Sequence, residues 1–281
     1  MPLTYSLHKI DAADRFGFCP EAYSRFKFGD EKVARNFGTQ LARGFISDYL
    51  SLLPEAQQLV VISSPYSFIP TATFAMKNHF VFQLNRWLAE NGRPVVQETK
   101  VHRTITYKED YGELSAEQRI NLISNDSFHI DRHFLAGKTL LFLDDIKITG
   151  SHERMILKMI GEYELDNPVV MLYFAELVNH SIHPSIENQL NYSYVKSIFD
   201  LNEIIKSGHF FINTRIVKYI LNYEFDGFRI FMQDQPESFA DTLYNMAIGN
   251  GYHTIEAYAR NLDYIKNYLI TNSHKTISHG N

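Results

Sequence analysis

The segment that decides the fold reads Thr139-Leu-Leu-Phe-Leu-Asp-Asp-Ile-Lys-Ile-Thr-Gly-Ser-His152. Residues 138–143 carry a continuous apolar run, and a run of this kind predicts a central strand covered on both faces. Two adjacent carboxylates, Asp144 and Asp145, follow at the carboxyl end of this strand. Ligands of open α/β sheets bind at that end, so we expect the two carboxylates to face a ligand.

A short turn follows the carboxylates and contains Thr149, Gly150 and Ser151, and residues 151–163 have the pattern of a helix. Glycine lets the backbone approach a ligand closely and adopt a positive φ. The N–H groups of the turn and of the helix N-terminus together form an anion-binding site. One ligand would meet two carboxylates on one side and a phosphate-sized cup on the other. A ribose 5-phosphate, with its diol and its phosphate, has this arrangement.

An acidic pair after an apolar strand also occurs in other proteins. It is found in receiver domains and in Mg²⁺-dependent phosphatases, and a strand can simply end in polar residues. A phosphatase with Asp144 as its nucleophile would leave the Thr-Gly-Ser turn unexplained. The position of that turn, with a helix directly after it, favours phosphoribosyl binding.

The first two-thirds of the chain alternate helical and extended patterns, which is typical of an α/β domain. Helices are predicted over residues 31–53, 70–89 and 151–163, and strands over residues 59–63, 94–106, 138–143 and 169–174. Beyond about residue 200 the pattern becomes mostly helical, with segments at 215–221, 238–248 and 254–270. We therefore expect an α/β domain over residues 1–200 and a helical C-terminal extension over residues 201–281.

The composition is that of a soluble globular protein. Of 281 residues, 45% are hydrophobic and 21% charged, and the net charge of −5 argues against a basic nucleic-acid binder. An anionic small molecule remains compatible with this charge, because backbone N–H groups can hold a phosphate locally. The single cysteine excludes a disulfide within the chain and fits a reducing compartment. With no signal pattern and no long apolar stretch, we expect a cytoplasmic protein without membrane contact.

The deciding segment resembles the 5-phosphoribosyl-1-pyrophosphate signature of type I phosphoribosyltransferases, and the sequence before it resembles their ComF-like (competence-protein-F-like) branch. In that branch a strand with an arginine leads into a loop with Leu, Arg, Asn and Phe. The corresponding residues here are Arg103, Leu114, Arg119, Asn121 and Phe128. The stretch Phe26-Lys-Phe-Gly-Asp30 is similar to the Lys-Tyr-x-Gly-Asp opening of the branch.

This resemblance covers residues 23–178. It implies an α/β fold with a type I phosphoribosyltransferase-like parallel sheet flanked by helices. The mostly helical C-terminal appendage has no counterpart in the resemblance.

The resemblance also implies a role for each part of the site. Asp144 and Asp145 are expected to hold the ribose hydroxyls, directly or through Mg²⁺. The expected 5-phosphate loop consists of Lys147, Ile148, Thr149, Gly150, Ser151 and His152. The turn expected to bind pyrophosphate consists of Ser63, Ser64, Pro65 and Tyr66. Residues 100–127 correspond to a flexible loop that closes over the ligand, with Arg103 and Lys108 as candidate pyrophosphate contacts.

Three positions depart from the family pattern. Ile148 replaces a small hydroxyl residue two positions before Gly150, and His152 replaces another two positions after it. These two changes remove side-chain donors from the phosphate cup, for which backbone N–H groups and His152 could compensate. The pyrophosphate turn has Ser64-Pro65-Tyr66 in place of the common Arg-Gly-Gly character.

The resemblance implies a phosphoribosyltransferase that transfers ribose 5-phosphate from 5-phosphoribosyl-1-pyrophosphate to an acceptor and releases pyrophosphate, with Mg²⁺ as its cofactor. The acceptor is a small molecule that the sequence leaves open. The alternative is a non-catalytic regulatory protein that binds phosphoribosyl pyrophosphate or a nucleotide on the same fold, because fold does not fix function. A homodimer is compatible with both.

Overall fold

The computed structural model describes residues 2–53, 57–103 and 128–278, and in these residues five strands form one parallel sheet. Every pair of neighbouring strands is parallel, so all five finish at the same edge. The strand order is β1 (Leu3–Ile10), β7 (Val169–Leu177), β6 (Thr139–Lys147), β2 (Leu59–Ser63) and β3 (Gln97–Thr99). The predicted α/β class with a parallel sheet is confirmed.

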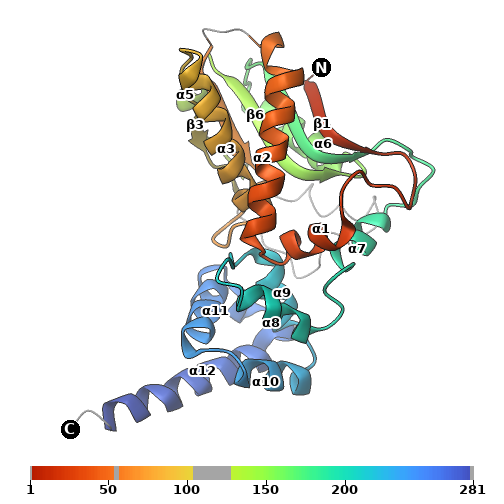
Figure 1. The fold of residues 1–281 in the computed structure, drawn as a ribbon. Helices are drawn as coiled ribbons and strands as arrows, with labels where there is room; N and C mark the ends of the chain where they lie inside the picture. The colour runs from red at the N-terminus through yellow and green to blue at the C-terminus, as the bar shows by residue number, and fades with distance from the viewer. Residues whose placement is uncertain (1, 54–56, 104–127, 279–281) are drawn as a thin grey trace.

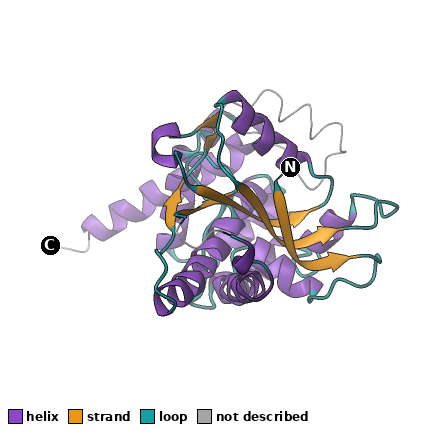
Figure 2. Cartoon of the chain, turned by 90° about the horizontal axis from the view of Figure 1, so that it is seen from above, coloured by secondary structure: helices purple, strands orange, loops and turns teal. Residues whose placement is uncertain are grey.

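Helices cover both faces of the sheet, as Figures 1 and 2 show. Helices α2 (Glu31–Asp48) and α3 (Ala72–Glu90) pack on one face, and α6 (Ser151–Glu162) packs on the other. Alternate side chains of β6 point to opposite faces, so Leu141 is buried against α2 and α3 and Phe142 against α6. This explains why the central strand is apolar without interruption.

Strand β6 is longer than the sequence predicted. The prediction ended it at residue 143, but it continues to Lys147 because β7 pairs with it as far as Glu176. On its other side the partner strand β2 ends earlier, with Ser63 opposite Leu143. The prediction that the acidic pair follows the strand is therefore wrong. Both carboxylates lie inside β6, at the point where β2 has ended.

The C-terminal third is mostly helical, as predicted. Its helices are α8 (Leu201–Ile205), α9 (Thr214–Leu221), α10 (Phe225–Gln233), α11 (Glu237–Gly249) and α12 (Glu256–Ser278). They enclose a hydrophobic core of their own, into which Phe28 and Ile69 of the α/β part are also packed. The exact division of the chain after residue 200 stays a prediction.

The remaining elements are short. They are α1 (Pro20–Lys27), α5 (Arg132–Leu135), α7 (Ile186–Asn191), the 3₁₀ turns Leu50–Leu52, Ile198–Asp200 and Tyr252–Thr254, and an antiparallel pair of β4 (His102–Arg103) and β5 (Phe128–His129). In the described ranges, none of the helices combines the length and the apolar character needed to span a bilayer.

The helical part lies against the edge at which the strands finish (Figure 1). The N–H of Phe211 donates to the carbonyl of Gly29 at 2.8 Å, and this hydrogen bond attaches the helical part to the junction of α1 and α2. The N–H of Thr214 donates to the carbonyl of Pro70 at 2.9 Å, and the side chain of Asn250 accepts two backbone N–H groups just before Pro70. The helical part therefore holds two segments that border the carboxyl edge of the sheet.

Candidate functional site

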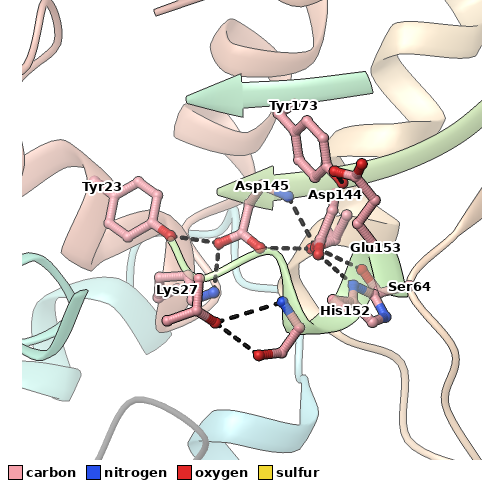
Figure 3. Close-up of polar contacts among 11 residues, drawn as sticks. Tyr23, Lys27, Ser64, Asp144, Asp145, His152, Glu153 and Tyr173 are labelled. Atoms are coloured by element: carbon pink, nitrogen blue, oxygen red, sulfur yellow. Dashed lines mark hydrogen bonds and ion pairs between the residues drawn. The ribbon is translucent and has the colours of Figure 1, made fainter. Parts of the chain in front are cut away.

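Asp144 lies between two of the predicted subsites (Figure 3). Its Oδ1 accepts a hydrogen bond of 2.7 Å from the hydroxyl of Ser64, and its Oδ2 lies 2.5 Å from Nδ1 of His152. Ser64 belongs to the predicted pyrophosphate turn after β2, and His152 to the predicted 5-phosphate loop at the start of α6. Two segments that are far apart in the sequence thus meet at one carboxylate.

Asp145 has different neighbours, because successive side chains of a strand alternate in direction. Its Oδ2 accepts a hydrogen bond of 2.5 Å from the hydroxyl of Tyr23 and forms an ion pair with Lys27 (Figure 3). Both partners belong to α1. The side chain of Asp145 is 7% exposed, against 16% for Asp144. In this structure Asp145 is therefore enclosed, and Asp144 is the more accessible carboxylate.

Thr73, near the start of α3, connects the two carboxylates. Its hydroxyl lies 3.3 Å from Oδ1 of Asp144 and 3.2 Å from Oδ1 of Asp145, and its side chain is buried. The sequence analysis did not identify this residue. Its place at the start of the helix that follows β2 is the only signal in the sequence, because such a helix begins beside the carboxyl edge of the sheet.

The surroundings of Asp144 keep it ionised. Burial opposes the charge, but the attraction of His152 and hydrogen bonds with the side chains of His152, Ser64 and Asp145 outweigh burial and hold the pKa of Asp144 well below its usual range. Burial, followed by the charge of Asp145, raises the pKa of Tyr23 well above its ordinary value, so its hydroxyl stays protonated and donates. Asp144 is thus an anionic oxygen acceptor suited to a hydroxyl or a hard cation.

The predicted turn of the 5-phosphate loop is present. Gly150 has φ +67°, as the sequence predicted, and α6 begins at the next residue. The hydroxyls of Thr149 and Ser151 lie 2.8 Å apart. The guanidinium of Arg154 donates to the Thr149 carbonyl and to the Ser151 hydroxyl, both at 3.0 Å. The sequence analysis did not identify Arg154. Both of these contacts are with uncharged oxygens, so neither neutralises the charge of the guanidinium.

The side chains of two other residues of the predicted loop are either paired or apolar in this structure. Lys147 lies 2.7 Å from a carboxylate oxygen of Glu153 and 3.2 Å from one of Glu176, so its charge is already paired. Ile148 is buried. Any contact of these residues with a phosphate stays a prediction.

The predicted pyrophosphate turn lies beside the acidic pair and next to a lysine. Ser63 is the last residue of β2, and Tyr66 forms an isolated bridge with His102 of β4. The ammonium of Lys100 lies 3.9 Å from the centre of the Tyr66 ring and donates to the carbonyl of Ser67 at 2.5 Å. Lys100 is therefore a cation at this turn.

The other predicted pyrophosphate contacts are only partly described. Arg103 lies in β4, whose backbone pairs with β5. Lys108 and most of the predicted closing loop, residues 104–127, lie outside the described residues.

The carboxylate of Asp144 is the group at this site that fits a magnesium ion shared with a ligand. Within the described ranges, no three His, Cys, Asp or Glu side chains gather into a group that could hold a metal ion. Mg²⁺ usually takes one or two carboxylates and completes its shell with water and substrate phosphate oxygens. Asp144 could supply such a carboxylate, while Asp145 is occupied by Lys27 and Tyr23.

Several solved structures resemble part of this chain. A hypoxanthine phosphoribosyltransferase from Staphylococcus aureus is 11% identical, with a TM-score of 0.32, and the match covers 53% of this chain and 75% of that one. The hypoxanthine-guanine enzyme of L. donovani is 15% identical, with a TM-score of 0.31, over 52% and 70% of the chains. A hypoxanthine enzyme from Trypanosoma cruzi is 18% identical, with a TM-score of 0.32, over 54% and 77%. At these low identities and TM-scores, the activities of those enzymes do not transfer to this chain.

A comparison with curated proteins finds no match. A sequence profile of the family described as "PRTase ComF-like", in contrast, matches residues 1–265, which includes most of the C-terminal helices. The family match therefore extends beyond residues 23–178, the part of the chain that the resemblance covered. The chain belongs to the ComF-like family of phosphoribosyltransferases.

Proposed function

We propose that this protein binds 5-phosphoribosyl-1-pyrophosphate with Mg²⁺ at the carboxyl edge of its sheet and transfers the ribose 5-phosphate group to a small-molecule acceptor, with release of pyrophosphate. The observation that carries the proposal is the position of Asp144 between Ser64 and His152. A ligand with a phosphate at each end and a diol between them would reach both segments while its diol lies at the carboxylate.

The described residues suggest how the ligand is oriented. The 5-phosphate would lie at the turn around Gly150, where backbone N–H groups at the start of α6 and the guanidinium of Arg154 are available. The ribose hydroxyls would contact Asp144. The pyrophosphate would point toward Ser64 and the ammonium of Lys100. Asp145 would be held from the side of α1 by Tyr23 and Lys27.

The transfer would be a displacement at the anomeric carbon of the ribose. The bond from that carbon to the pyrophosphate oxygen breaks, and the electron pair leaves with pyrophosphate, while a lone pair of the acceptor forms the new bond. Bound Mg²⁺ would supply charge neutralisation for the leaving group. Within the protein, Asp144 orients the diol and Arg154 and the turn hold the phosphate, so the reacting carbon is held in position.

A non-catalytic regulatory protein on the same fold is the second candidate. The observations that favour it are the burial of Ile148 and the pairing of Lys147 with Glu153 and Glu176, which leave the 5-phosphate loop with few side-chain donors. Such a protein would bind the same ligand without turnover.

One experiment separates the two candidates. The purified protein is incubated with phosphoribosyl pyrophosphate, Mg²⁺ and a metabolite extract, and released pyrophosphate is measured with Asp144→Asn as the control. Acceptor-dependent release by the wild type alone supports the enzyme. Calorimetric binding without release under any extract supports the regulatory protein, and absence of binding contradicts both.

Two further expectations accompany the proposal. The location is expected to be cytoplasmic, which imaging of a tagged protein in its own cells would test. A homodimer is compatible with the site, and sedimentation of the purified chain would measure the oligomeric state.

A further inference from the structure

The stretch Phe26-Lys-Phe-Gly-Asp30 has no part in the reaction described so far, yet its lysine reaches the acidic pair. The ammonium of Lys27 forms an ion pair with Oδ2 of Asp145, and the two side chains are 12% and 7% exposed. The hydroxyl of the fully buried Tyr23, one helical turn earlier, donates to the same oxygen at 2.5 Å. Figure 3 shows both side chains approaching Asp145 from α1.

The other residues of this stretch fix Lys27 in place. Lys27 is the last residue of α1, and Gly29, with φ +90°, turns the chain directly after it. A Cβ atom on Gly29 would overlap the carbonyl oxygen of Phe211, so glycine also allows the C-terminal helices to approach. The side chain of Asn213 donates to the carbonyl of Lys27 at 3.2 Å. The lysine is thus held between the sheet and the helical part of the chain.

The ion pair changes the charge that a ligand meets. Two adjacent ionised carboxylates would place two negative charges at a site that has to accept a strongly anionic ligand, and charges of like sign repel strongly where burial lowers the local dielectric constant. Lys27 compensates the charge of Asp145. Of the two carboxylates, Asp144 is then the one whose partners, Ser64 and His152, belong to the predicted ligand subsites.

We propose that Lys27 is a positioning residue, which neutralises Asp145 and, with Tyr23, holds it away from the ligand, so that Asp144 is the carboxylate that meets the ribose. This inference rests on the proposed function, because it assigns roles within the same site. In this proposal the role of the Phe26–Asp30 stretch is to place the ammonium of Lys27 beside Asp145.

A rescue experiment tests the inference. Lys27→Met keeps the aliphatic stem but leaves Asp145 without its counter-ion, so the affinity for phosphoribosyl pyrophosphate with Mg²⁺ should fall about tenfold or more. Adding Asp145→Asn to Lys27→Met removes the uncompensated charge, so the double variant should recover most of the loss. Lys27→Arg keeps the charge and should lose much less affinity than Lys27→Met. Dissociation constants come from calorimetry and melting temperatures from thermal unfolding.

Lys77→Met is the matched control, because Lys77 is similarly buried and pairs with Glu98 rather than with the acidic pair. Its effect should fall on the melting temperature more than on ligand affinity. A merely structural role for Lys27 predicts the same pattern as for Lys77, with no recovery of affinity in the double variant, and that result would overturn the inference.

Two outcomes remain to be separated. If Lys27→Met does not fold, the comparison moves to Asp145→Asn with and without Lys27→Met, and the inference requires these two to bind with similar affinity. If the wild type does not bind the ligand, the proposed function itself has failed. Binding without rescue refutes only the role of Lys27.

Discussion

Replacing Asp144 with asparagine tests the proposed ligand site most directly. Asparagine has nearly the same shape, so Oδ1 can still accept from Ser64 at 2.7 Å and from the N–H of Asp145 at 2.9 Å. The substitution removes the negative charge and replaces the Oδ2 atom that contacts His152 with an amide group. It therefore changes the electrostatics of the site more than its packing.

The expected loss of affinity follows from the contacts that the carboxylate can make. One charge-assisted hydrogen bond to a ribose hydroxyl contributes about 1.5–3 kcal/mol, which corresponds to a roughly 10- to 150-fold weaker dissociation constant. The variant should also be less stable than the wild type at neutral pH, and this difference should shrink at acid pH. The pKa of Asp144 is lowered in the folded protein, so its charge stabilises the fold above the ordinary aspartate pKa of about 4, and this stabilisation is lost as the pH falls through the lowered value.

Calorimetric titration with phosphoribosyl pyrophosphate and Mg²⁺ measures the affinity of wild type and variant. The matched control is Asp48→Asn, because Asp48, like Asp144, accepts from a side-chain hydroxyl, here that of Tyr5, but lies at the far end of α2. It should leave the dissociation constant unchanged. Equal affinity of wild type and Asp144→Asn, with a folded variant, would refute the assignment of the site.

Three further predictions concern other parts of the molecule. Burial and then the neighbouring Asp48 raise the pKa of Tyr5 to about 12, so its stabilisation is complete below the ordinary tyrosine pKa of about 10 and is lost as the pH rises through about 12; equilibrium unfolding at alkaline pH should show a weaker pH dependence in Tyr5→Phe than in the wild type. Gly150→Ala places a side chain in the left-handed region of backbone conformation and should cost about 1–2 kcal/mol of stability, measured by denaturant unfolding. The added Cβ would have its nearest neighbour at 3.5 Å, so the loss would come from backbone strain and not from a clash. An unchanged stability would contradict the observed φ. In purine-type members of the fold, an acidic residue two positions before the loop glycine assists at the base nitrogen. Ile148 at that position can neither donate nor accept a proton, so hypoxanthine, guanine and adenine should be poor acceptors, and steady-state turnover of any of them with a kcat/KM of about 10⁴ M⁻¹s⁻¹ would contradict this.

The sequence predicted elements whose cause is local. Strand β2 has the predicted bounds because its apolar run is short and bordered by polar residues. Helix α6 begins at Ser151 as predicted, because Gly150 supplies the left-handed turn before it. Strand β1 was missed, because it lies at the edge of the sheet and only partly buries its side chains. The length of β6 was missed because it is determined by pairing with β7.

The same distinction applies to the site. The residues of the acidic pair and the loop around Gly150 could be predicted, because they follow one another in a single segment. The neighbours Lys27 and Thr73 could not, because their contacts with Asp145 join residues 118 and 72 positions apart. The sequence shows that a lysine lies in the N-terminal stretch, but only the contacts of α1 with β6 show which charge it meets.

The helical C-terminal part is best understood through the two segments that it contacts. Asn213 and Phe211 hold the junction that carries Lys27, and thereby the side of Asp145. Asn250 accepts from the N–H groups of Phe68 and Ile69, in the segment that follows Ser64, and thereby holds the side of Asp144. The segments that flank Asp144 and Asp145 are therefore both held by residues of the C-terminal third, which lie far away in the sequence. The family match likewise continues past the sheet, to residue 265.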